Sequence, residues 1–171
     1  MLIALKMNFA ELGVLRLLQA LAEHNAELLR RSPELPLLYD SCVVYKREQD
    51  ETFCDFPNML HQMEEDCDGL AAARAGELMA RGYKALREGD GGYEVATRLK
   101  LSSIPAQVML TTHTSPGTPG LYHCIVRYWV KGVAYRDDPS ARLGMVQNRV
   151  DPSIVKSCHL INLSSEQWRT A

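Results

Sequence analysis

Residues 121–137 read LYHCIVRYWVKGVAYRD, and this stretch decides the class of fold. Aromatic and β-branched residues dominate positions 121–130, which predicts a strand there. Lys131-Gly132 then stands between two valines, where a two-residue hairpin turn would lie. We therefore predict that the chain returns as a second, antiparallel strand over residues 133–137.

The register of this hairpin assigns a face to each of two neighbouring aspartates. If the two turn residues are looped out, Val130 lies opposite Val133, and side chains alternate between the faces from there on. Asp138 then lies on the face that carries His123, one diagonal step away. Asp137 points to the opposite face. The register predicts a contact between His123 and Asp138.

The first half of the chain has helical character. Leucines recur at intervals of three, four and seven between residues 8 and 31, which predicts a long amphipathic helix. A short apolar run at 41–45 predicts a strand, and the charged segment 46–55 predicts a loop. A second helix is expected from Asp66 to Arg81, with Gly82 as its C-terminal cap.

Shorter patterns mark the second half of the chain. Residues 93–100 alternate and residues 107–112 are rich in β-forming types, so both are expected as strands. Residues 114–120 predict a turn, and the tail from Asp151 predicts a short final element. Because helices precede an antiparallel sheet, the fold class is expected to be α+β.

Composition excludes several classes of protein. The chain has 171 residues, 46% hydrophobic and 23% charged, with a net charge of -2, which fits one globular domain. Without an excess of basic residues, generic nucleic-acid binding is not expected. No long uncharged run and no leader pattern is visible, so no membrane association is expected. Five cysteines without a CxxC pair favour reduced thiols and a cytoplasmic location.

Cys67 is the candidate nucleophile. Residues 64–71 read EEDCDGLA, so Asp66 is a good N-cap and Cys67 falls in the first helical turn, where the helix dipole favours a thiolate. The neighbouring acids oppose this effect by repelling a thiolate. A histidine partner is therefore needed. The alternative is that Cys67 is a core residue, because it shares a helical face with Ala71, Ala75 and Leu78.

A histidine and an aspartate complete a possible catalytic set. His123 would take the proton of Cys67 as general base and later return it to a leaving amine. Asp138 would orient the imidazole and stabilise its charged form. The pattern therefore predicts a thiol enzyme that acts on an amide or isopeptide bond.

The cysteine in 64–71, the histidine in Tyr122-His123-Cys124 and the aspartate in Asp138-Pro139-Ser140 together resemble the Cys-His-Asp core of the transglutaminase-like superfamily, a papain-like fold. Residues 137–145, DDPSARLGM, are similar to small phage-borne and prophage-borne members. The resemblance covers roughly residues 64–145. Two departures are Ile125, where many members carry tryptophan, and the acids that replace a glycine before the cysteine.

The resemblance implies a particular organisation. It predicts a single domain over 1–171, with an N-terminal helical segment at 1–40 and a catalytic core at 64–145, whose helix packs on an antiparallel sheet. It implies no cofactor and a peptide or protein substrate, with phage structural proteins as possible partners. A phage-encoded protein would lie in the host cytoplasm or the virion.

Several alternatives stay open from the sequence. Gln62 or Tyr45 would supply the side chain of the oxyanion hole, and Asp151-Pro-Ser153 offers a second acid of the same form as Asp138. Hydrolysis and cross-linking are not separated by the motif, although the small size favours hydrolysis. The substrate and the oligomeric state are not predicted.

Two other classes of function compete with the thiol enzyme. The chain could be an inactive transglutaminase-like fold that serves as a binding or virion-assembly module. Alternatively, a metal site could use polar side chains whose spacing matches no regular zinc motif. Its candidate ligands are His61, Asp66, Cys67, His113 and His123.

Overall fold

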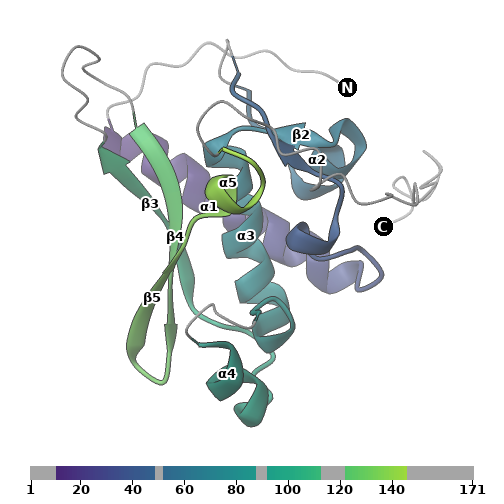
Figure 1. The fold of residues 1–171 in the computed structure, drawn as a ribbon, viewed down its shortest axis with the longest axis vertical. Helices are drawn as coiled ribbons and strands as arrows, with labels where there is room; N and C mark the ends of the chain where they lie inside the picture. The colour runs from purple at the N-terminus through teal and green to yellow at the C-terminus, as the bar shows by residue number, and fades with distance from the viewer. Residues whose placement is uncertain (1–10, 49–51, 88–91, 113–121, 146–171) are drawn as a thin grey trace.

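The computed structural model describes residues 11–48, 52–87, 92–112 and 122–145 as helices, strands and connections (Figure 1). The helical elements are α1 (Glu11–Arg31), η1 (Leu38–Asp40), α2 (Phe56–Gln62), α3 (Cys67–Arg81), η2 (Gly82–Lys84), α4 (Tyr93–Leu99) and α5 (Pro139–Arg142). The strands are β1 (Val44–Tyr45), β2 (Glu64–Glu65), β3 (Ala106–Thr112), β4 (Tyr122–Val130) and β5 (Val133–Asp137). This mixture of helix and sheet confirms the α+β class.

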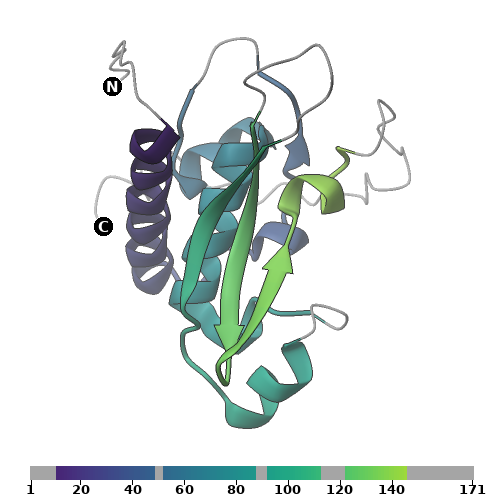
Figure 2. The ribbon, with the colours of Figure 1, turned by 90° about the vertical axis from the view of Figure 1, so that its left-hand side faces the viewer.

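Helix α3 lies at the centre of the described structure, with the sheet on one side and α1 alongside (Figures 1 and 2). The Asp66 side chain caps the helix by accepting from the Asp68 N–H, as the sequence predicted. Every residue from Asp68 to Leu78 is buried. A helix that is buried on all sides must contact a neighbour at every turn, and its four buried alanines allow close approach.

Two hydrophobic clusters enclose α3. The larger one joins α3 to α1 and to the sheet, and it includes Leu18, Ala75 and Val126. The smaller one joins α3 to α2, to the segment after α1 and to Leu143 beyond α5. The central helix is therefore fixed from both sides, and its N-terminus is held relative to the sheet.

The sheet has the antiparallel order β3-β4-β5. Val130 pairs with Val133 and Val126 with Asp137, so the predicted register is confirmed. Both turn residues have positive φ, 50° for Lys131 and 78° for Gly132, as a type I′ hairpin requires.

Strand β5 does not extend as far as the start of its antiparallel neighbour β4. Its last residue, Asp137, pairs with Val126, whereas β4 begins at Tyr122. Pro139 has no N–H to donate to the ladder and instead begins α5. The first residues of β4 are therefore not paired by β5, and the N-terminus of α3 lies near this part of the sheet.

One local prediction needs correction, and one helix was missed. Residues 93–100 were expected as a strand, but 93–99 form helix α4. Val95 and Ala96 pack against the same cluster, which adjacent strand residues on opposite faces could not do. Helix α2 was not predicted, although Asp55 caps it and a proline occupies its first turn, a recognisable start signal.

The expectation of reduced thiols is wrong for Cys42, which is disulfide-bonded. The other predicted helices, strands and turns agree with the structure or fall outside the described residues. The helix expected from residue 8 is present as α1, and the strand expected at 41–45 is present as the shorter β1. The turn at 114–120 and the tail from Asp151 lie outside the described residues. Within the described ranges, the helices lack the length and apolar character of a membrane-crossing segment.

Gly76 sets the closeness of α3 to α1. A Cβ at this position would lie 2.8 Å from the Ala22 carbonyl oxygen and 2.7 Å from the Asn25 Cβ. We predict that Gly76→Ala lowers the free energy of unfolding by about 1–3 kcal/mol, because the helices must move apart. Intrinsic helix propensity alone would raise it by about 1 kcal/mol. Urea denaturation measures whether the free energy of unfolding falls or rises. A variant more stable than the parent would contradict the close packing of α3 against α1.

Candidate active site

Three side chains from different elements meet near the N-terminus of α3. The His123 Nε2 of β4 lies 2.8 Å from the Asp138 Oδ2 that follows β5. The Cys67 side chain at the start of α3 is hydrogen-bonded to His123. The contact between His123 and Asp138 that the hairpin register predicted is present.

Asp138 is fixed by a second hydrogen bond. Its Oδ1 accepts from the Ala141 N–H at 3.1 Å, so the carboxylate also caps α5. Because the imidazole uses Nε2 for Asp138, Nδ1 is the ring nitrogen that remains for Cys67. The carboxylate thus selects the tautomer and the orientation of the histidine.

The Cys67 sulfur occupies the space that the early end of β5 leaves beside β4. In an antiparallel ladder with this register, the Cys124 N–H points to the β5 side. That N–H and the Cys124 thiol are both hydrogen-bonded to the Cys67 sulfur. Cys67 is half-buried, so it both packs against the core and reaches the surface. It therefore fits both interpretations from the sequence, as a nucleophile and as a core residue.

These contacts favour an ion pair of thiolate and imidazolium. The hydrogen bond from the Cys124 thiol lowers the pKa of Cys67 to about 5, against burial, with further help from His123 and the Cys124 N–H. The hydrogen bonds with Asp138 and Cys67 raise the pKa of His123 to about 9, again against burial. Between these values the charged forms of both groups are favoured.

Two of the acids around Cys67, Glu65 and Asp68, are buried. Asp66 raises the pKa of Cys67. Glu65 is 2% exposed and accepts a hydrogen bond from the Cys54 thiol at 2.6 Å. Burial raises the pKa of Glu65 to about 7, and burial together with Glu65 raises the pKa of Cys54. Cys54 is thus a half-buried thiol that stays protonated at neutral pH.

The two candidates for the oxyanion hole differ in their surroundings. Tyr45 lies in β1, opposite Glu65 of the parallel strand β2, which leads directly into α3. Burial, and then the negative charge of Cys67, raise the pKa of Tyr45, so its hydroxyl lies within electrostatic range of the sulfur. Gln62 is exposed at the end of α2. The structure therefore favours Tyr45.

The structure does not assemble the metal ligands that the sequence suggested. His61 is exposed on α2, and His113 lies outside the described residues, as does Asp151, the predicted alternative to Asp138. Within the described part of the chain, the metal-capable atoms that come within 4.8 Å of one another belong to Glu65, Asp66 and Asp68. This acidic cluster shares only Asp66 with the predicted set.

Residues that sequence reasoning did not assign surround the three side chains. Cys124 is hydrogen-bonded to the Cys67 sulfur, although the sequence analysis gave it no role. Arg74, in the middle of α3, is fully buried and bonds to Asp137. An arginine inside an alanine-rich buried segment, and an aspartate directed toward that helix by strand parity, were the signals that could have predicted this pair.

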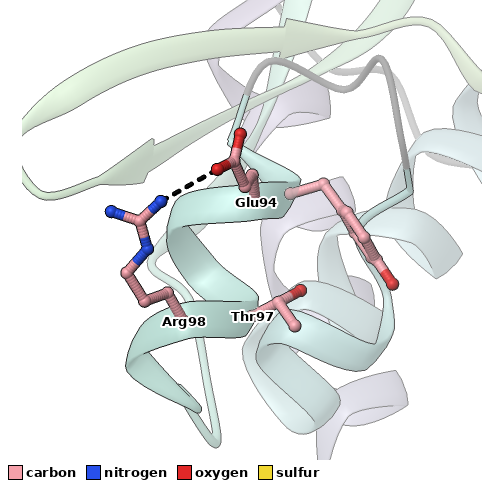
Figure 3. Close-up of a pocket in the computed structure, with 4 residues that line it drawn as sticks. Glu94, Thr97 and Arg98 are labelled. Carbon is pink, nitrogen blue, oxygen red and sulfur yellow. Dashed lines mark hydrogen bonds and ion pairs between the residues drawn. The ribbon is translucent and has the colours of Figure 1, made fainter.

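A separate hollow lies on α4 (Figure 3). Tyr93, Thr97 and the ion pair between Glu94 and Arg98, 2.8 Å apart, line it. It contains none of the three side chains of the candidate site. We therefore assign it no role in the chemistry.

Comparisons with known proteins returned no match, whether with family models, with curated proteins or with solved structures. The interpretation of the site therefore depends on its own geometry and on the sequence pattern.

We predict that iodoacetamide alkylates Cys67 in a step centred near pH 5, because the thiolate already exists there. A second step is expected near pH 9, where His123 loses its proton. Peptide mapping by mass spectrometry, with rates measured from pH 4 to about 10, follows each cysteine separately.

Cys54 is the matched control thiol, because it is also half-buried but has a raised pKa. It should stay unmodified at pH 6 while Cys67 reacts. His123→Ala should move the lower step of Cys67 upward. Equal labelling of Cys54 and Cys67 at pH 6, or a step for Cys67 near the ordinary thiol value, would contradict the ion pair.

Proposed function

We propose that the protein is a thiol-dependent hydrolase that cleaves an amide or isopeptide bond with Cys67, His123 and Asp138. One observation carries the proposal. A half-buried thiol at the start of a helix is hydrogen-bonded to an imidazole. The Nε2 atom of that imidazole is in turn hydrogen-bonded to a carboxylate oxygen, 2.8 Å away. This chain of contacts is what a thiol nucleophile needs for activation and orientation. The resemblance of the sequence to transglutaminase-like enzymes supports the same assignment.

The first half of the reaction is acylation. The Cys67 thiolate attacks the carbonyl carbon, and the electron pair of the carbonyl moves to oxygen. The His123 imidazolium gives its proton to the leaving nitrogen as the carbon–nitrogen bond breaks. An amine departs, and a thioester to Cys67 remains.

The second half returns the enzyme to its starting state. Neutral His123 takes a proton from water, whose oxygen attacks the thioester carbonyl. The carbon–sulfur bond breaks, a carboxylic acid leaves, and the thiolate and imidazolium are restored. If an amine replaced water, the same steps would form a cross-link.

Two donors support the negative oxygen of the tetrahedral intermediate. The Cys67 N–H belongs to the first turn of α3, where N–H groups have no acceptor within the helix. The capping carboxylates of Asp66 and Asp68 bind the next two N–H groups. The Tyr45 hydroxyl, carried by strand β1, is the second donor.

Acyl transfer from p-nitrophenyl acetate tests the mechanism without knowledge of the natural substrate. We predict that the protein gains one acetyl group on Cys67 and releases nitrophenolate in a burst. Cys67→Ala should remove both signals, and Cys54→Ser should remove neither. Absence of the acetyl group, with a folded protein, would favour a non-catalytic binding module.

Asp138→Asn tests the role of the carboxylate. The asparagine oxygen can still cap α5, but its NH₂ group would face His123 and force the ring proton onto Nδ1, toward Cys67. We predict a fall of about 10²–10⁴-fold in the acylation rate at pH 7, by analogy with other catalytic triads. Circular dichroism should show an intact fold. A rate within about threefold of the parent would exclude Asp138 from the mechanism.

A further inference from the structure

We propose that Asp137, held by Arg74 and Arg142, is a positioning residue that sets the place of Asp138 beside His123. This inference rests on the proposed function, because it concerns the same site. It assigns a role to a charged cluster that the reaction itself does not use.

The pairing of Asp137 is close and buried. Its Oδ2 accepts from the Arg74 Nε at 2.7 Å, and its Oδ1 lies 3.1 Å from the Arg142 Nε. The side chains of Arg74 and Asp137 are 0% and 1% exposed. Arg142, exposed on α5, is thus a second arginine at the same carboxylate. Three segments, α3, the end of β5 and α5, are joined at one group.

These are the segments that carry the reactive side chains. Cys67 begins α3, and Arg74 lies seven residues later, two turns along the same helix. Asp138 directly follows Asp137 and caps α5. The bond from Arg74 to Asp137 therefore fixes the nucleophile's helix against the backbone that carries the orienting acid.

Charge balance argues for a structural clamp and against an anion site. Around the Tyr39 ring lie the guanidinium groups of Arg74, Arg87 and Arg142, with carbons 4.4, 5.4 and 5.0 Å from the ring centroid. Their carboxylate partners are Asp137, Glu77 and Asp40. Three positive groups thus have three negative partners, and no net charge remains to attract an anionic ligand.

A buried ion pair is a costly way to gain stability, because desolvation opposes the attraction. Its benefit is directional, since an arginine with several acceptors tolerates few arrangements. Arg74 meets this description, with Nε bound to Asp137 and Nη1 bound to Glu77 at 2.9 Å and to the Ala85 carbonyl. The arrangement specifies where β5 ends relative to α3.

Asp137 is placed to affect His123 through the backbone. Strand parity places its side chain on the α3 face, opposite to His123 and Asp138. A loss of the clamp should therefore shift Asp138 away from the imidazole rather than remove a charge that His123 senses directly. This distinction gives the inference a specific test.

The test compares Asp137→Asn with Glu77→Gln. Both variants remove one buried carboxylate from Arg74, but Glu77 points to the Leu38 N–H, away from β5. We expect Asp137→Asn to slow acetylation of Cys67 about 10- to 100-fold and to lower the pKa of His123, read from its imidazole NMR signals. Glu77→Gln should leave that pKa unchanged, even if it lowers the melting temperature equally.

Asp137→Asn in the Asp138→Asn background separates an effect of Asp137 that passes through the backbone and Asp138 from a direct effect on His123. If Asp137 acts through Asp138, adding Asp137→Asn to Asp138→Asn should change the rate by less than about twofold. A further loss of the full single-variant size would overturn the proposal. So would an Asp137→Asn protein with the parent's rate and the parent's His123 pKa.

Arg142→Gln covers the case in which Asp137→Asn does not fold, because Arg142 is exposed and its removal leaves Arg74 in place. We expect a smaller loss in the same direction, and an unchanged His123 pKa would overturn the inference. Failure of the proposed function looks different. The parent itself would then not be acetylated, whereas the NMR titration would still report whether the clamp controls His123.

Discussion

Burial of α3 on every side is the constraint on which the rest of the structure depends. An enclosed helix must offer small side chains to its neighbours, and α3 meets this need with alanines and with Gly76, which lies against the backbone of α1. Clusters on two sides then fix its axis and its depth. As a result Cys67, at the first position, is held beside the sheet by the packing of the whole helix rather than by its own contacts.

The site exists because a strand is short. Asp138-Pro139 ends β5 at the level of Val126, which leaves the Cys124 N–H free of a strand partner and within reach of Cys67. The same dipeptide begins α5, whose cap is Asp138. One local feature of the sequence thus opens the space for the sulfur, supplies a donor to it and fixes the acid that orients His123.

The sequence allowed prediction of the parts that follow local rules. Hairpin register follows from a two-residue turn, so the side of Asp138 could be predicted, and the Asp66 cap located the start of α3. Residues 93–99 were assigned wrongly, because in seven residues an alternating and a helical pattern overlap and packing decides. The contacts of Cys124 and Arg74 with residues far along the chain depend on how α3 is placed on the sheet. No local pattern encodes that placement.

Two adjacent aspartates carry opposite tasks, and strand geometry makes this possible. Asp137 faces α3 and closes a buried ion pair, whereas Asp138 faces the other way and meets His123. A slip of one residue would turn Asp137 toward the face of His123 and Asp138 toward α3, so neither carboxylate would keep its present partners. It would break the contacts of Asp137 with Arg74 and Arg142 and the contact of Asp138 with His123 together. The buried ion pair and the contact with His123 therefore depend on the same register of the hairpin.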